Sequence, residues 1–203
     1  MGRMTYWVNV SLDLRIERSA ADRVAGEEGG GWVRIDEQLF REFNERARGV
    51  ALWVEGRIIY EMMETVWPSA AEDESLPDHL REWGTIWTAA PKILVSNSRT
   101  TAGHNTRIVG GADTIAQLAA VRDETDGMIA VGGATLATQL LQHGLLDELL
   151  LYTHPAILGS GRPLFDDITE PLECDLLEHA AFESGVAMNR YQIRDQRTEQ
   201  SAH

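Results

Sequence analysis

Two consecutive glycines stand between a strand pattern and a helix pattern in the second half of the chain. Gly132 and Gly133 follow an apolar strand predicted at Met128–Val131, and a helix is predicted directly after them over Ala134–His143. Glycine lets the backbone approach a phosphate closely, and the free N–H groups of the first helical turn point at it. The pair therefore predicts a site for the pyrophosphate of a dinucleotide. The alternative is a glycine pair that serves only as a tight turn or a packing point.

Arginine is the residue with which this chain would hold a phosphate. The sequence has 18 basic residues, and Lys92 is the single lysine among them. A guanidinium at a glycine-bounded strand end can contact a phosphate through two parallel hydrogen bonds. Arg57 has such a position, because it follows Gly56 after a strand predicted at Val50–Val54. The alternative for Arg57 is an ion pair with Glu61, one helical turn further on.

Composition argues against several classes of function. The formal net charge of −14 argues against nucleic-acid binding, which requires a basic face. The single cysteine, Cys174, leaves no intramolecular disulfide and no zinc site built from several cysteines. The histidines show no ligand spacing such as H-E-x-x-H, so no metal site is predicted. No segment reaches the roughly 20 apolar residues needed to cross a bilayer, and we expect a cytoplasmic protein without membrane contact.

The elements that must position these residues alternate between strand and helix patterns, as in α/β proteins with a mostly parallel sheet. Strands are predicted at Thr5–Val10, Val50–Val54, Lys92–Ser96, Arg107–Val109, Met128–Val131 and Glu148–His154. Helices are predicted at Asp36–Arg48, Ile58–Thr65, Asp78–Trp87, Thr114–Val121 and Ala134–His143. The stretch from Leu172 to Arg194 predicts an antiparallel hairpin that completes the sheet. We therefore expect one α/β domain over residues 1–194, with helices flanking a central sheet, and a polar tail at residues 195–203.

Four ordered motifs point to a known family. They read GRIIYE from Gly56, VSNS from Val95, VGGATLATQLL from Val131 and LLLYTHP up to Pro155. Together they resemble the dihydrofolate reductase-like fold, in which turns of these types grip NADPH. The closer resemblance is to the bacterial families with the RibD C-terminal domain, the reductase domain of riboflavin biosynthesis. Their D-E-L…P-x-x-L-G-x-G…L-F pattern ends here at Phe165, and the chain resembles a stand-alone member.

The resemblance implies NADPH as the cofactor and assigns residues to its parts. Arg57 would lie beside the 2′-phosphate, and the residues after the third strand would hydrogen-bond the same phosphate. The glycine pair and the helix start after it would receive the pyrophosphate, where the helix dipole favours negative charge. The cofactor residues implied in this way are Gly56, Arg57, Ser96, Asn97, Ser98, Gly132, Gly133, Ala134, Thr135 and Leu136.

The resemblance also implies substrate residues, namely Asp36 or Glu37 together with Thr153. In dihydrofolate reductases a tryptophan a few residues before an acidic helix start places a carboxylate under the pteridine ring, and Trp32 precedes both acids here. Such a carboxylate would orient an amino-pyrimidine and help to deliver a proton, with Thr153 next to it. The alternatives are that Asp36 only caps its helix and that Thr153 is an ordinary half-buried strand residue.

Two departures from the riboflavin-pathway pattern affect the choice of substrate. Leu14 stands where those families have the glycine of S-L-D-G, and Trp7 stands where a lysine is common. An aromatic ring in the first strand suits a flat hydrophobic substrate better than a sugar phosphate. We therefore expect hydride transfer from NADPH to a small pterin-like or pyrimidinone-like heterocycle. The alternatives are a riboflavin-pathway (phosphoribosylamino)uracil reductase and a non-catalytic NADPH-binding protein, and the resembling families imply a homodimer.

Overall fold

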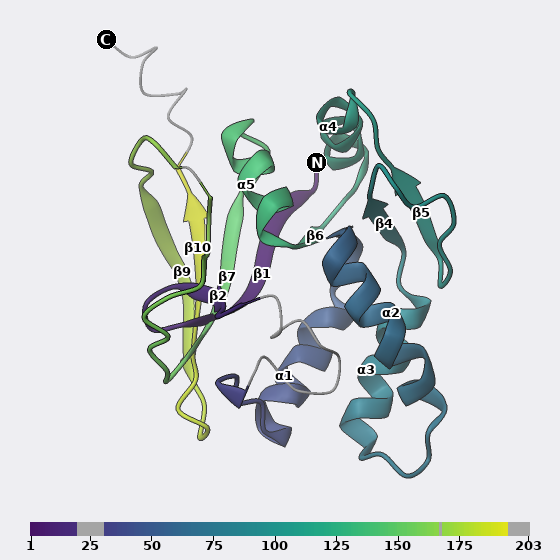
Figure 1. The fold of residues 1–203 in the computed structure, drawn as a ribbon, viewed down its shortest axis with the longest axis vertical. Coiled ribbons are helices and arrows are strands. Elements are labelled where there is room, and N and C mark those ends of the chain that lie inside the picture. The colour runs from purple at the N-terminus through teal and green to yellow at the C-terminus, as the bar shows by residue number, and fades with distance from the viewer. Residues whose placement is uncertain (20–30, 167, 195–203) are drawn as a thin grey trace.

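The computed structural model describes residues 1–19, 31–166 and 168–194, which form an α/β fold (Figure 1). The predicted tail at residues 195–203 lies outside the described residues. In chain order the elements are β1 (Arg3–Ser11), β2 (Arg15–Glu17), α1 (Glu37–Arg48), β3 (Val50–Gly56), α2 (Arg57–Glu72), α3 (Asp78–Ala89), β4 (Lys92–Val95), β5 (Thr106–Val109), α4 (Thr114–Glu124), β6 (Met128–Gly132), α5 (Ala134–Gln142), β7 (Glu148–His154), β8 (Arg162–Pro163), β9 (Cys174–Ala181) and β10 (Ala187–Ile193).

An eight-stranded sheet forms the centre of the molecule, in the order β5-β4-β3-β6-β1-β7-β10-β9. The strands from β5 to β7 pair in parallel, whereas β10 pairs antiparallel with both β7 and β9. This arrangement confirms the predicted mostly parallel sheet with a C-terminal antiparallel hairpin. Parallel strands end at one edge of a sheet, so the segments that follow β1, β3, β4, β6 and β7 meet there. We call this edge the carboxyl edge.

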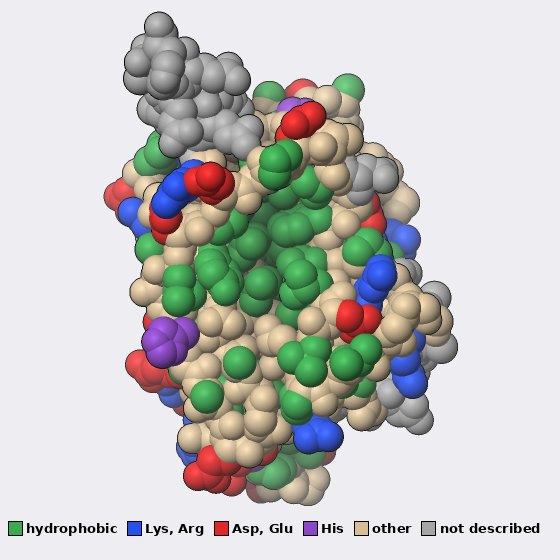
Figure 2. Space-filling model, turned by 90° about the vertical axis from the view of Figure 1, so that its left-hand side faces the viewer, with side chains coloured by type: hydrophobic (Ala, Val, Ile, Leu, Met, Phe, Trp, Pro, Cys, Tyr) green, Lys and Arg blue, Asp and Glu red, His purple; other side chains and the backbone are tan. Residues whose placement is uncertain are grey.

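The C-terminal hairpin leaves β9 at the end of the strand order. Two consecutive leucines of β9, Leu176 and Leu177, are 53% and 45% exposed, although successive side chains of a strand point to opposite faces. Figure 2 shows hydrophobic side chains gathered in a hollow on the side of the molecule that carries this hairpin. A contiguous apolar surface of this kind is typical of an interface with another chain.

Helices α1, α2 and α3 cover one face of the sheet, and aromatic rings fill much of the space beneath them. The ring of Trp7 on β1 lies among four other rings, with centroids 5.5–6.2 Å away. Those four rings belong to Phe43, Trp53, Trp83 and Tyr152. Aromatic pairs at such separations contribute about 0.5–1.5 kcal/mol each beyond the area they bury, so this cluster ties α1 and α3 to β1, β3 and β7.

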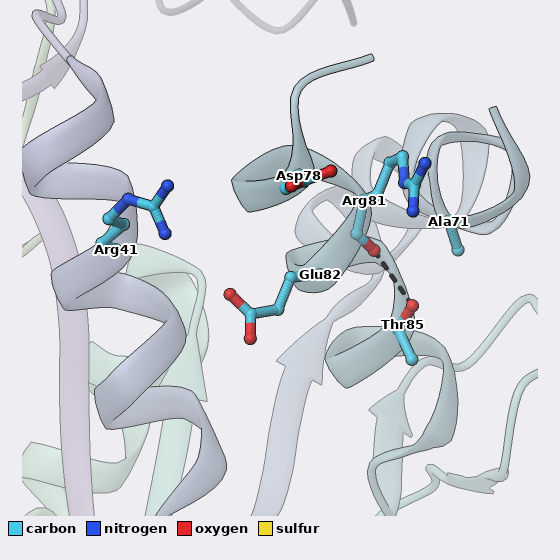
Figure 3. A pocket seen from close by; sticks show the side chains of 6 residues that line it. All are labelled: Arg41, Ala71, Asp78, Arg81, Glu82 and Thr85. Carbon is cyan, nitrogen blue, oxygen red and sulfur yellow. Dashed lines mark hydrogen bonds between the residues drawn. The ribbon is translucent and has the colours of Figure 1, made fainter. Parts of the chain in front are cut away.

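A hollow of about 430 Å³ lies at the surface of this helical layer, where α1 faces α3 (Figure 3). Two arginines and two acids line it, so it carries no net preference for an anion. None of its lining residues belongs to the predicted cofactor or substrate set. The lining residues are Arg41, Ala71, Asp78, Arg81, Glu82 and Thr85.

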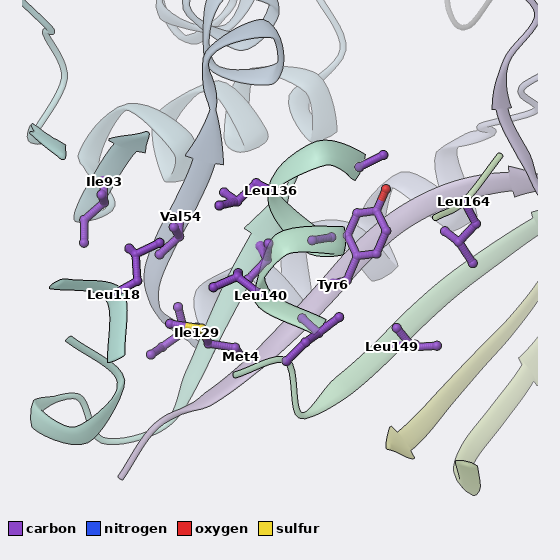
Figure 4. Close-up of a cluster of buried hydrophobic side chains, with 14 of the residues drawn as sticks. Met4, Tyr6, Val54, Ile93, Leu118, Ile129, Leu136, Leu140, Leu149 and Leu164 are labelled. Carbon is purple, nitrogen blue, oxygen red and sulfur yellow. The ribbon is translucent and has the colours of Figure 1, made fainter. Parts of the chain in front are cut away.

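Helices α4 and α5 cover the opposite face of the sheet, over a cluster that is mostly aliphatic (Figure 4). Ile129 of β6, Leu118 of α4 and Leu140 of α5 are fully buried there. Burial of each such side chain contributes about 1.5–3 kcal/mol relative to its exposure to water. The cluster therefore fixes α5, and with it the predicted pyrophosphate turn, against the sheet.

Helix α2 extends to Glu72, seven residues beyond the predicted end at Thr65, and contains Pro68. A proline signals a helix end in a sequence, because it removes one backbone hydrogen bond. Here close packing against α3 keeps the helix intact. A Cβ atom on Gly84 of α3 would lie 2.6 Å from the carbonyl oxygen of Trp67, so only glycine permits this approach of the two helices.

Candidate functional site

Two glycine turns contact each other at the carboxyl edge. Gly56 ends β3 and Gly132 ends β6, and these two strands are neighbours in the sheet. A Cβ atom on Gly133 would lie 3.7 Å from both Cα and N of Gly56. Gly133 also has a φ of 105°, which residues with a side chain rarely adopt. Both turns thus present bare backbone at one place, as the close approach of a phosphate requires.

Helix α5 starts directly after this contact and offers backbone N–H groups. Its first hydrogen bond runs from N of Ala137 to O of Gly133 at 2.9 Å, so the N–H groups of Ala134, Thr135 and Leu136 have no partner within the helix. The side chains of Ala134 and Leu136 are buried in the core, so these residues would contact a ligand only through their backbone. The turn fits a pyrophosphate, which the positive end of the helix dipole favours.

Arg162 adds a positive charge beside this helix start, and sequence reasoning missed it. Its Nη2 atom donates hydrogen bonds to Oγ1 of Thr135 at 2.6 Å and to Oδ2 of Asp166 at 2.7 Å. Arg162 belongs to β8, which pairs with β2 in a small second sheet. Strands of two and three residues carry no periodic pattern, so no signal in the sequence placed Arg162 near Thr135.

The segment after β4 forms a tight turn beside the end of β3. Oγ of Ser96 accepts hydrogen bonds from the N–H groups of Ser98 at 3.2 Å and of Arg99 at 3.1 Å. Oδ1 of Asn97 accepts one from the N–H group of Gly111 at 2.8 Å, which ties this turn to the end of β5. Ser96 and Asn97 therefore hold the turn in shape, while Ser98 is exposed at the predicted phosphate position.

Two arginines share one carboxylate next to this turn. Nη1 of Arg57 donates to Oε2 of Glu61 at 2.8 Å, the ion pair that was the alternative for this residue. Arg99 lies 3.4 Å from the other oxygen of Glu61 and 3.1 Å from Glu64. Exposed ion pairs contribute about 0–1 kcal/mol, so a phosphate dianion can compete for Arg57. The pairing with Glu61 is therefore compatible with a role in phosphate binding.

Both acids at the start of α1 have partners within their own helix. Oδ1 of Asp36 accepts a hydrogen bond from the N–H group of Leu39 at 2.8 Å, so Asp36 is the N-cap. Glu37 pairs with Arg41 at 2.6 Å, and the hydrogen bond from Arg41 lowers the pKa of the Glu37 carboxyl. An exposed carboxylate with a lowered pKa is a poor proton donor near neutral pH. The geometry favours the capping role for Asp36, and catalysis by either acid stays a prediction.

Thr153 does not lie next to Asp36, contrary to the prediction. Successive residues of a strand point to opposite faces, and Leu149 and Leu151 of β7 belong to the cluster under α4 and α5. Thr153 has the same parity and shares their face. Tyr152 belongs to the cluster under α1, so the residue of β7 that faces the start of α1 is His154.

His154 anchors the segment that leads into α1. Its Nδ1 atom accepts a hydrogen bond from the N–H group of Arg34 at 2.9 Å, so Nε2 carries the proton and donates to Oδ1 of Asn9 at 3.0 Å. Burial, together with the charge of Arg34, lowers the pKa of His154 to about 4. The ring of Trp32 packs edge-on against it at 5.7 Å. The imidazole is therefore neutral at neutral pH and positions Trp32 and Asp36.

We expect Asp36→Asn and Glu37→Gln to leave turnover and NADPH affinity within a few-fold of the wild type. Asparagine caps a helix about as well as aspartate, so the free energy of unfolding of Asp36→Asn should change by less than ~1 kcal/mol. Steady-state kinetics, calorimetric titration with NADPH and thermal melts check both single variants and the double variant. A large loss of turnover at unchanged NADPH affinity would instead support catalysis by these acids.

The described residues also bear on metals and membranes. Within them, no group of three or more His, Cys, Asp or Glu side chains is placed to hold a metal ion. No helix in these parts of the chain is long and apolar enough to pass through a membrane.

Comparisons with known proteins place this geometry in a family. A family model described as RibD C-terminal domain matches residues 8–188. The chain is 40% identical over 60 residues to YyaP of Bacillus subtilis (strain 168), a match that covers 30% of this chain and 32% of that protein. RibD of Acinetobacter baumannii is similar in fold, with 15% identity and a TM-score of 0.64 over 96% of this chain and 59% of that one. Dihydrofolate reductase of Enterococcus faecalis, solved with NADP(H), has 14% identity and a TM-score of 0.60 over 96% of this chain and 98% of that one. The predicted dihydrofolate reductase-like fold is confirmed.

Proposed function

Because the chain belongs to the RibD C-terminal domain family, we propose that it is an NADPH-dependent reductase of a small pterin-like or pyrimidinone-like heterocycle. The observation that carries the proposal is the contact between the turn at Gly56 and the turn at Gly132 and Gly133, directly before α5. Bare backbone, free N–H groups and a positive helix end at one place are what a dinucleotide pyrophosphate requires. Bound NADPH would supply the hydride, while the protein would hold and orient it.

The chain's own positive groups support two separate anion contacts. At the start of α5, backbone N–H groups and the nearby guanidinium of Arg162 would hold the pyrophosphate. At the ends of β3 and β4, Arg57 and Arg99 would hold the 2′-phosphate, with the turn at Ser98. In a chain with a formal net charge of −14, positive groups at the carboxyl edge direct an anionic cofactor to that edge.

The substrate class follows from the aromatic floor under α1. Trp7 stacks on Trp53 and Tyr152 with interplanar angles of 28° and 29°. The rings around Trp7 carry no charged group that would pair with a sugar phosphate. A flat, uncharged heterocycle therefore suits this surface better than the (phosphoribosylamino)uracil of the riboflavin pathway.

The test combines calorimetric titration of NADPH with assays of reduced-nicotinamide absorbance. Candidate substrates are dihydrofolate, the pyrimidinone phosphate of riboflavin synthesis and a panel of small carbonyl compounds. We expect turnover of a flat heterocycle without phosphate. Turnover of the pyrimidinone phosphate alone would support the pathway reductase, and binding without turnover would support a non-catalytic NADPH-binding protein. Absence of NADPH binding would contradict the proposal.

We also propose that two copies of the chain form a homodimer through the hairpin of β9 and β10. An edge strand with exposed leucines on both faces invites pairing with a second copy, and Figure 2 shows an apolar surface continuous with it. A two-fold axis would bury the same patch from each copy.

Leu176→Glu should convert the dimer to a monomer. Burial of a leucine contributes about 1.5–3 kcal/mol, and a two-fold interface loses one leucine from each copy. The dimer Kd should therefore rise by roughly a hundredfold or more. Sedimentation equilibrium measures the change, with Leu172→Glu, an exposed leucine outside β9, as the control. A wild-type monomer at micromolar concentration, or an unchanged dimer in Leu176→Glu, would contradict the proposed interface.

A further inference from the structure

A buried carboxyl group lies directly beneath the two glycine turns. Glu55 is the last residue of β3 before Gly56 and is 1% exposed. It is paired in register with Gly132 of β6, and a Cβ atom on Gly132 would lie 3.6 Å from Cγ of Glu55. Among the described residues, Oε2 of Glu55 has no hydrogen-bond partner. A buried acceptor without a partner is rare and costly, so this position invites a functional explanation.

The groups packed around Glu55 do not neutralise it by direct contact. Helix α3 presents the indole of Trp87, whose Nε1 atom donates to Oε1 of Glu55 at 3.1 Å. Strand β4 presents the ammonium of Lys92, which lies 4.6 Å from the centre of the Trp87 ring and donates to the carbonyl oxygens of Trp87 and Ala90. Helix α2 presents Ile59 and the neutral phenol of Tyr60, and β6 presents Gly132. In the described parts of the chain, Lys92 has no carboxylate within ion-pair distance.

Both buried groups titrate near physiological pH. Burial raises the pKa of Glu55 to about 7, although the hydrogen bond from Trp87 and the charge of Lys92 act in the opposite direction. Burial also lowers the pKa of Lys92 to about 8, against the charge of Glu55. Below both values the pair carries one positive charge, and above both values it carries one negative charge. The space beneath the glycine turns therefore changes the sign of its charge over a narrow range of pH.

Building on the proposed function, we propose that binding of a dinucleotide phosphate at the glycine turns is coupled to uptake of one proton by Glu55. A bound phosphate brings negative charge close to a buried carboxyl that no cation contacts. Coulomb repulsion in a low-dielectric interior favours the neutral acid, because it removes the repelling charge. The proton comes from solvent and forms the O–H bond of the Glu55 carboxylic acid. The orphaned Oε2 is the oxygen free to carry it.

Proton uptake is measured by titrating NADPH calorimetrically near pH 7.5 in buffers with different ionisation enthalpies. The 2′-phosphate, with a second pKa near 6, is already ionised at that pH. If the pKa of Glu55 rises by about one unit in the complex, we expect uptake of about half a proton per NADPH and about fivefold weaker binding near pH 9 than near pH 7. Glu55→Gln keeps the shape and the acceptor for Trp87 but cannot titrate, so it should abolish the uptake.

Two control variants assign the proton. Glu148→Gln removes another fully buried carboxylate, one that pairs with Arg3 and Arg190, and should leave the uptake intact. Lys92→Met tests the second titrating group and should retain uptake by Glu55. Uptake that persists in Glu55→Gln, or that disappears only in Lys92→Met, would overturn the proposal. NADPH binding without proton uptake overturns the proposal alone, whereas absence of binding in the wild type overturns the proposed function as well.

Discussion

Gly133→Val is expected to abolish binding of both NADPH and NADH. The Cβ atom would lie 3.7 Å from the backbone of Gly56, and the two methyl groups of valine would extend over the N–H groups that start α5. Hydrogen bonds to a charged group contribute about 1.5–3 kcal/mol each, so loss of two contacts to the pyrophosphate weakens binding roughly 150-fold or more. Calorimetric titration with both dinucleotides measures the loss, and circular dichroism establishes that the variant is folded.

Gly127→Val provides a control for backbone strain. Gly127 precedes β6 and has a φ of 103°, close to the 105° of Gly133 at the other end of the same strand. Strain of about 1–3 kcal/mol is therefore expected in both variants and lowers their melting temperatures similarly. Only Gly133→Val should lose the dinucleotide. If Gly133→Val binds NADPH normally, or if both variants lose it equally, the glycine pair is a packing device.

The sheet was predictable because its strands and crossover helices each carry a periodic pattern. The strand predicted at Glu148–His154 matches β7 in both bounds, and those around Met128 and Lys92 are correct within one residue. The glycine turns were predictable for a different reason. A strand that ends in two glycines before a helix has few structural explanations, and the observed contact with Gly56 fits close approach of a phosphate.

Features that depend on contacts between distant segments could not be predicted. Arg162 reaches Thr135 through a small sheet that has no sequence pattern, and the burial of Glu55 arises from α2 and α3 closing over β3. The extension of α2 through Pro68 depends on Gly84 in the next helix. The position of Thr153 was predictable in principle, because strand alternation alone places it on the face of Leu151. The resemblance that paired it with Asp36 compared sequence positions without the faces of the strand.

Arg57→Ala is expected to weaken NADPH binding far more than NADH binding. The lost contact is a charge-assisted hydrogen bond to the 2′-phosphate, which NADH lacks. We expect a loss of about 1.5–3 kcal/mol for NADPH, roughly 10- to 150-fold in Kd, and little change for NADH. The variant also leaves Glu61 next to the phosphate with only Arg99 to balance it, which further disfavours NADPH. Calorimetric titration of both dinucleotides gives the ratio of the two affinities.

Arg41→Ala is the matched control, because Arg41 forms the same kind of exposed ion pair, with Glu37, one turn apart on α1. It should leave both affinities unchanged, since α1 contributes no predicted contact to the cofactor. Glu61→Gln is the complementary variant: it releases Arg57 from its ion pair and should strengthen NADPH binding without affecting NADH. An equal loss for both dinucleotides in Arg57→Ala would show that the arginine stabilises the turn at Gly56. The 2′-phosphate would then have to be held by Arg99 and the turn at Ser98, which Arg99→Ala would test directly.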